Sequence, residues 1–91
     1  MAKTFLISYD LKQPGQDYAG LYNAIKSLGE WQHPLESTWV VSVPSSYDAS
    51  MIYKELKPCA DKHDNMFVVE ITGANRQGWL AKSFWSWMKD K

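Results

Sequence analysis

The chain has 91 residues, of which 45% are hydrophobic and 22% are charged, as is typical of one small globular domain spanning residues 1–91. Ten basic and ten acidic residues give a formal net charge of zero, which argues against a protein that grips nucleic acid through many phosphate contacts. The single cysteine, Cys59, excludes an internal disulfide and a CxxC metal site. We therefore expect a reducing cytoplasmic location. The chain shows neither a signal peptide nor the run of about 20 apolar residues that a transmembrane helix needs.

The first predicted element is a buried β-strand over Thr4–Leu11 that ends in a single acid. The strand is rich in aromatic and branched residues and contains no breaker. Asp10 lies near its end, and an ionised carboxylate in such a strand is costly unless a metal ion, a partner subunit or solvent stabilises it. Asp10 is therefore the first candidate for chemistry. The alternative is that it caps the turn before Pro14 by accepting backbone N–H bonds.

The rest of the chain alternates predicted helices and strands. Apolar residues at helical spacing predict the helices, and runs of β-branched and aromatic residues predict the strands. In chain order they are a helix over Asp17–Leu28, a short extended segment over Glu30–Leu35, a strand over Ser37–Val43, a helix from about Asp48 to Lys57, a strand over Asn65–Thr72 and a final helix over Gln77–Lys89. Gly29 is expected to form a left-handed cap after the first helix, and Asp48 is a candidate N-cap of the second.

This order predicts an α+β fold, a ferredoxin-like sandwich of β-α-β-β-α-β with an added C-terminal helix. Alternate residues of three strands would face the helices, namely Phe5, Ile7, Tyr9, Trp39, Val41, Val43, Phe67, Val69 and Ile71. The opposite face would carry Leu6, Ser8, Asp10, Thr38, Val40, Ser42, Met66, Val68 and Glu70. Because four of these nine residues are apolar, we expect this face to form a dimer surface or to be covered in part by the last helix. Dimerisation would also add burial to a chain that buries only about 60–65% of its unfolded surface.

Several segments resemble a known family. The chain is similar to the CRISPR-associated Cas-two family in three segments. They are Tyr9-Asp10-Leu11 at the end of the first strand, Leu28-Gly29 after the first helix, and Glu36-Ser37-Thr38-Trp39-Val40-Val41. Within it, the chain resembles the short SinR-like proteins of bacterial and phage genomes. This resemblance extends to three further patterns, Trp31-x-His33-x-Leu35-x-Ser37-Thr38-Trp39, Leu56-Lys57-Pro58 and Glu70-x-Thr72-Gly73. The final aromatic helix also fits the SinR-like subgroup.

The resemblance implies a ferredoxin-like homodimer. The best-known members bind DNA, some cut RNA or DNA with a divalent metal, and the related virulence-associated protein D group resembles a toxin ribonuclease. It implies that Asp10 meets its symmetry mate across the dimer interface, where two carboxylates would share one Mg²⁺ or Mn²⁺. That metal would polarise a phosphoryl oxygen and activate a water. The chain departs from the family after this aspartate: members usually carry several Arg and Lys there, but Leu11–Asp17 holds only Lys12, and Arg76 is the single arginine.

Four further residues are candidates for supporting roles. Ser8 and Ser37 would help to hold a metal-bound water, although serines in strands more often hydrogen-bond locally. Glu70 is predicted on the same face as Asp10, where it would complete a metal site or pair with a lysine of the partner chain. Trp85 lies off the apolar stripe of the final helix, so we expect it to be exposed or at an interface.

Two classes of function remain open. The first is a metal-dependent endoribonuclease or phosphodiesterase in which Asp10 from each subunit holds the ion. The second is a catalytically silent, dimeric interaction module of a phage or mobile element that binds a host protein or a CRISPR component. The neutral charge, the scarcity of Arg and Lys after Asp10 and the aromatic final helix favour the second. Both predict a homodimer with at most weak binding of RNA or DNA. Neither predicts a membrane-surface helix, because the polar face of the final helix has few cations.

Overall fold

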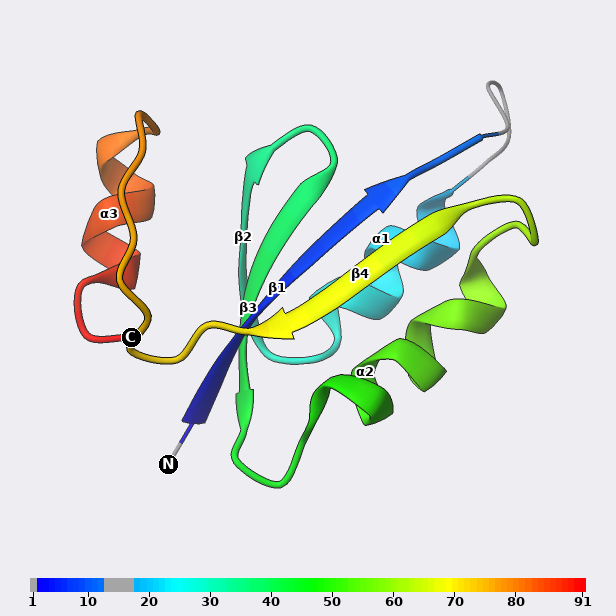
Figure 1. Cartoon of the computed structure of the whole chain (residues 1–91), viewed down its shortest axis with the longest axis horizontal. Coiled ribbons are helices and arrows are strands. Elements are labelled where there is room, and N and C mark those ends of the chain that lie inside the picture. Colours follow the sequence, from blue (N-terminus) through cyan, green and yellow to red (C-terminus); the bar gives the residue numbers. More distant parts are fainter. Residues whose placement is uncertain (1, 13–17) are drawn as a thin grey trace.

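The strands of the described chain form one four-stranded antiparallel sheet in the order β2-β3-β1-β4, so that β1 lies between β3 and β4 (Figure 1). The computed structural model describes residues 2–12 and 18–91. The strands are β1 (Ala2–Asp10), β2 (Glu30–Leu35), β3 (Thr38–Pro44) and β4 (Asn65–Glu70). The helices are α1 (Ala19–Lys26), α2 (Ala49–Leu56) and α3 (Lys82–Met88), with a short 3₁₀ helix, η1 (Lys57–Cys59), after α2.

The predicted elements are present, but several of their ends differ. The predicted N-terminal end of the first helix, Asp17, lies outside the described residues, and the final helix begins at Lys82 rather than at Gln77. Asp48 caps α2 as predicted, because its carboxylate accepts a hydrogen bond of 2.8 Å from the backbone N–H of Met51. Pro34 is tolerated within β2 because this strand lies at the edge of the sheet, where a missing N–H costs least.

The main core lies between one face of the sheet and helices α1 and α2. The predicted inward residues of β1 and β3 are confirmed, since they are buried together with apolar residues of both helices. The most deeply buried members are Phe5, Ile7, Leu21, Ile25, Trp39, Val41, Val43, Ile52 and Leu56. Burial of this apolar surface is the main source of the domain's stability.

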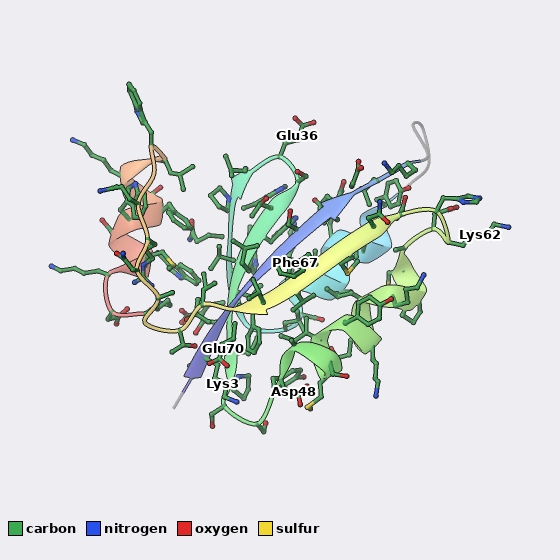
Figure 2. The ribbon with its side chains drawn as sticks, viewed as in Figure 1. Lys3, Glu36, Asp48, Lys62, Phe67 and Glu70 are labelled. Atoms are coloured by element: carbon green, nitrogen blue, oxygen red, sulfur yellow. The ribbon has the colours of Figure 1, made fainter. Side chains whose placement is uncertain are left out.

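Strand β4 presents the opposite set of residues from the one predicted. Its register pairs Val68 with Ile7 and Met66 with Tyr9, so Met66 and Val68 pack against the main core. Phe67 therefore lies on the other face, with 62% of its surface exposed (Figure 2). The prediction that Phe67 and Val69 face the helices is therefore wrong, because the inward positions of β4 are displaced by one residue from the predicted ones. Both alternating sets of β4 are apolar, so alternation alone could not decide between them.

Helix α3 covers part of the second face of the sheet. Val40, which points away from the main core, is buried with Phe84 and Met88 in a smaller apolar cluster. Ile71 packs on this cluster and not on the helix-covered face predicted for it. In Figure 1, α3 lies apart from α1 and α2, at the left. The expectation that the last helix covers part of this face is therefore confirmed.

The single arginine, Arg76, forms hydrogen bonds with the C-terminal end of α3. The guanidinium of Arg76 donates to the backbone carbonyl of Met88 at 2.9 Å and to that of Lys91 at 3.3 Å. The backbone N–H of Gly73 donates to the same Lys91 carbonyl at 2.9 Å. These bonds satisfy carbonyls that a helix end leaves without partners. Arg76 is thereby committed to holding α3 in place.

Gly29 is required by close packing rather than by its backbone conformation. A Cβ atom at this position would lie 2.1 Å from the backbone oxygen of Ser42 in β3. The predicted left-handed cap is wrong, because Gly73 is the one glycine of the described residues with a positive φ. The turn from α1 into β2 therefore runs directly against the backbone of β3.

Replacing Gly29 by alanine should lower the free energy of unfolding by about 1–3 kcal/mol, because the new methyl group overlaps backbone that cannot move aside. Urea denaturation measures this change. Gly20→Ala in α1 is the matched control: its Cβ meets nothing within 4 Å, and alanine in a helix should stabilise the protein by up to about 1 kcal/mol. Equal unfolding midpoints for the two variants would contradict this account of Gly29.

Candidate functional site

Asp10 ends the central strand and is exposed. It lies opposite Asn65 of β4, and 63% of its side-chain surface is accessible. The hydrogen-bond and ion-pair partner of its carboxylate within the described residues is the Nζ of Lys12. The alternative that Asp10 caps the turn before Pro14 concerns residues 13–17, which lie outside the described residues. The exposure of the Asp10 side chain leaves its carboxylate accessible to a ligand.

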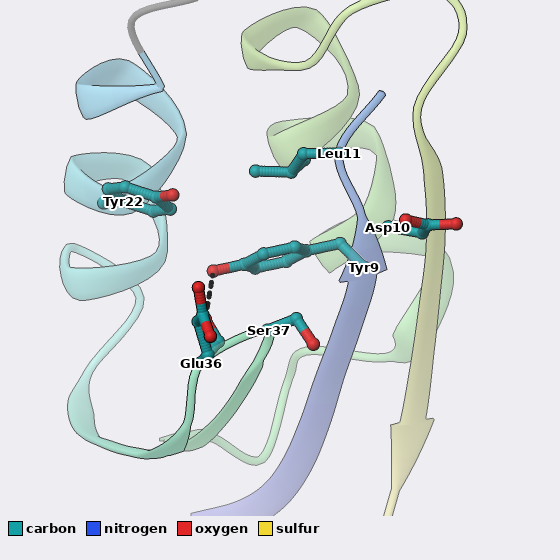
Figure 3. A pocket seen from close by; sticks show the side chains of 6 residues that line it. All are labelled: Tyr9, Asp10, Leu11, Tyr22, Glu36 and Ser37. Atoms are coloured by element: carbon teal, nitrogen blue, oxygen red, sulfur yellow. Dashed lines mark hydrogen bonds between the residues drawn. The ribbon is translucent and has the colours of Figure 1, made fainter. Parts of the chain in front are cut away.

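Two hollows lie on either side of Asp10. The first, of about 290 Å³, is lined by Tyr9, Asp10, Leu11, Tyr22, Glu36 and Ser37 (Figure 3). The second, of about 230 Å³, is lined by Ser8, Tyr9, Asp10, Asn65, Met66 and Phe67. In Figure 3 the side chains of Tyr9 and Leu11 point toward Tyr22, whereas that of Asp10 points the other way, toward β4. The carboxylate of Asp10 thus belongs to the second hollow.

The structure separates the residues predicted to support Asp10. Asp10 lines both hollows, but Ser8 lines the second, toward which the Asp10 carboxylate points, whereas Ser37 lines the first, beside Glu36. Glu70 lies at the opposite end of β4 from Asn65 (Figure 2), and its register pair with the core residue Phe5 puts it on the helix-covered face. Its carboxylate accepts a hydrogen bond of 2.9 Å from the hydroxyl of Thr72. The prediction that Glu70 shares the face of Asp10 is therefore wrong, because the register of β4 is shifted by one residue from the predicted one.

Trp85 is not exposed in the described structure, whereas its predicted alternative, a position at an interface, stays a prediction. It is half-buried beside the small cluster under α3, with its ring edge-on to Phe84 at a centroid distance of 5.3 Å. The most exposed tryptophan of the described residues is Trp79, which precedes α3 and has 99% of its surface accessible. Because α3 begins at Lys82 rather than Gln77, the helical spacing used in the prediction does not extend to Trp79.

The hollow that holds the Asp10 carboxylate has both polar and apolar lining residues. Ser8 and Asn65 line its hollow and supply a hydroxyl and an amide oxygen, donor types that Mg²⁺ and Mn²⁺ accept. No group of three or more His, Cys, Asp and Glu side chains suited to a metal ion occurs within residues 2–12 and 18–91. Among the described residues that line this hollow, Asp10 supplies the carboxylate.

Asp64 fastens the end of β1 to the loop before β4, a role that the sequence analysis missed. Its carboxylate accepts hydrogen bonds from the backbone N–H of Lys12 at 2.7 Å, the N–H of Asp61 at 2.8 Å and the hydroxyl of Tyr18 at 3.1 Å. Desolvation acts to raise the pKa of Asp64, but these three hydrogen bonds together outweigh it and lower the pKa. The only signal in the sequence was the Asp61-x-x-Asp64 spacing of a polar turn.

An aromatic cluster lies behind the first pocket, and the sequence analysis did not assemble it. The indole N–H of Trp39 donates to the hydroxyl of Tyr9 at 2.9 Å, and that hydroxyl donates to the backbone oxygen of Glu36 at 3.4 Å. Burial raises the pKa of Tyr9, so this side chain stays neutral. His33 stacks on Trp39 at a centroid distance of 3.9 Å, and Tyr22 stacks on its ring at 5.9 Å. The cluster holds the pocket wall in one arrangement.

No protein-family model, curated protein or solved structure gives a significant match to this chain. Within the part of the chain that the structure describes, no helix is both long enough and apolar enough to cross a membrane.

The lowered pKa of Asp64 predicts a loss of stability in acid. A carboxylate whose pKa is lowered by folding stabilises the protein above its ordinary pKa of 3.8, and this contribution disappears as the pH falls below that value. Asp64→Asn should therefore show a smaller fall in unfolding free energy than the wild type between about pH 5 and pH 2. Urea denaturation at several pH values measures it. Asp90→Asn, which removes an exposed carboxylate, serves as the control and should keep the wild-type dependence. If both variants behave like the wild type, the role assigned to Asp64 is incorrect.

Proposed function

We propose that the protein is a Cas-two-like, dimeric phosphodiesterase that cleaves RNA with a divalent metal ion held by Asp10 of each subunit. The observation that carries this proposal is the accessibility of the Asp10 carboxylate at the end of the central strand. A carboxylate bonded to several backbone N–H groups would bind a metal poorly. An exposed carboxylate paired with one lysine can exchange that partner at little cost, because such ion pairs contribute about 0–1 kcal/mol.

A ferredoxin-like fold is part of this proposal. The strand order β2-β3-β1-β4, the antiparallel pairing throughout and the two helices packed on one face all agree with it. Helix α3 would then be the added C-terminal element of the SinR-like subgroup. It covers the Val40 region of the second face and leaves the Phe67 region open.

The homodimer is supported by the apolar character of this open region. Phe67 is exposed, and Leu6 and Val69 beside it are only partly buried and form a register pair across β1 and β4. A second copy would cover these side chains and add burial to a small domain. Phe67 and Asp10 line the same hollow, so an interface centred on Phe67 would bring the Asp10 side chains of two copies toward each other.

Replacing Phe67 by glutamate should therefore shift the protein from dimer to monomer, because it puts a charge in the middle of the apolar interface. Sedimentation velocity at several concentrations measures this shift. Met51→Glu is the matched control, since Met51 is an exposed apolar residue of α2, on the other side of the sheet, with 41% of its surface accessible. A monomeric wild type, or a Phe67→Glu variant that stays dimeric, would contradict the proposed interface.

The residues around Asp10 have separable roles in this proposal. Asp10 of each copy would hold Mg²⁺ or Mn²⁺, which when bound supplies Lewis-acid polarisation of the phosphoryl group and a more acidic water. Ser8 and Asn65 would orient a water or a phosphate oxygen from the floor of the same hollow. Lys12, released from Asp10, would attract the phosphate. Ser37 and Glu70 have no part in this arrangement, because they lie in the other pocket and at the other end of β4.

Asp10→Asn should reduce Mg²⁺- or Mn²⁺-dependent cleavage of single-stranded RNA by at least about 100-fold, because it removes the negative charge that holds the ion. The side chain is exposed, so the variant should keep the wild-type unfolding midpoint. A fluorescent RNA assay with and without chelator measures the rate, and Asp90→Asn is the control for the loss of an exposed carboxylate elsewhere. Equal, metal-dependent cleavage by Asp10→Asn and wild type would point to a contaminating nuclease and end the proposal.

The second candidate is a catalytically silent, dimeric module that binds a host protein or CRISPR component. The observation that favours it is the full exposure of Trp79, because tryptophan is among the residues most enriched at the centres of protein interfaces. Arg76, committed to α3, is also not available for phosphate. If the protein has this second function, neither the wild type nor the Asp10→Asn variant should cleave RNA. Either function suits a reducing cytoplasm, because the single Cys59 forms no internal disulfide.

A further inference from the structure

The first pocket, next to Tyr9, is small and combines aromatic with polar lining residues. It lies between α1, the turn joining β2 to β3 and the end of β1 (Figure 3). The rings of Tyr9 and Tyr22, with centroids 6.3 Å apart and a tilt of 33°, form the wall together with Leu11. Its volume of about 290 Å³ is at the lower end of the range for ligand pockets. The space therefore suits one ring system rather than an extended ligand.

The polar groups of this pocket determine which hydrogen-bonding groups a bound ring system must carry. Glu36 and Ser37 form its polar side, and none of the described residues that line it is a lysine or an arginine. The hydroxyl of Tyr9 is already bonded to Trp39 and to the backbone of Glu36. An ionised carboxylate accepts hydrogen bonds and donates none. The pocket therefore disfavours a phosphate and favours a flat group with N–H donors along one edge.

We propose that this pocket binds one unpaired nucleobase of a single-stranded RNA and that it prefers guanine. Guanine presents two adjacent donors, N1–H and the 2-amino group, that match the two oxygens of the Glu36 carboxylate. Adenine and cytosine offer one amino group beside an acceptor, and the single N–H of uracil lies between two carbonyls. Stacking on tyrosine rings and hydrogen bonding along the Watson–Crick edge are the usual means of reading unpaired bases.

This inference rests on the proposed function and narrows its substrate. The base pocket and the Asp10 hollow share Tyr9 and Asp10 as lining residues. At this end of the sheet β1 extends past β3, since the last β1–β3 pair joins Ser8 to Thr38. An RNA strand with its base against Tyr22 would therefore have its backbone beside the end of β1, near the face that carries the Asp10 carboxylate. The pocket would select the position of cleavage.

Metal-free binding of guanosine, adenosine and uridine, followed by NMR titration, tests the pocket apart from catalysis. Guanosine should bind most tightly to the wild type, with shifts centred on Tyr9, Tyr22 and Glu36. Glu36→Gln should weaken the binding of guanosine by about tenfold and shift the preference toward adenosine, because an amide side chain both donates and accepts hydrogen bonds. Glu55→Gln, an exposed change on α2, should leave all three affinities unchanged.

The outcomes separate this inference from the proposed catalysis. Guanosine binding by a wild-type protein that does not cleave RNA would support the pocket and count against the phosphodiesterase. Equal affinities for the three nucleosides, or a guanosine affinity unchanged by Glu36→Gln, would overturn the base assignment. Tighter binding of free arginine than of guanosine would also overturn it and would indicate a site for a cationic side chain of a protein.

Discussion

The alternation of β1 is the constraint on which the rest of this structure depends. This strand lies between β3 and β4, and its odd-numbered residues, such as Phe5 and Ile7, enter the core beneath α1 and α2. Its even-numbered residues are consequently directed to the second face. At the end of the strand the same rule sends Tyr9 into an aromatic cluster and Asp10 outward. Two neighbouring residues thereby line two hollows of different chemistry.

The sequence was sufficient for the strands whose two faces differ in polarity. β1 and β3 alternate between large apolar residues and smaller or polar ones, so their inward residues could be predicted. The capping carboxylate of Asp48 was likewise visible, because an N-cap depends on its own helix and little else. These are features that local chemistry decides.

The sequence was insufficient where the decision depends on distant contacts. Phe67 and Val68 are both apolar, and the register of β4 against β1 alone determines which of them is buried. Gly29 could be recognised as special, but its reason is the approach of Ser42 from another strand. The candidate site shows the same limit. Asp10 was found from its position in the chain, whereas Glu36, Tyr22 and Asp64 converge on that end of β1 only in three dimensions.

The two edges of the sheet are not equivalent, and this difference governs how the protein can associate through its backbone. At the β2 edge, Pro34 lacks an N–H, and the pairing with β3 is irregular between Gln32 and Leu35. Both features disfavour the pairing of a strand from another chain with this edge. The β4 edge has a regular register from Asn65 to Glu70 and no proline. Extension of the sheet by an extended peptide, or misassembly at high concentration, would therefore begin at β4.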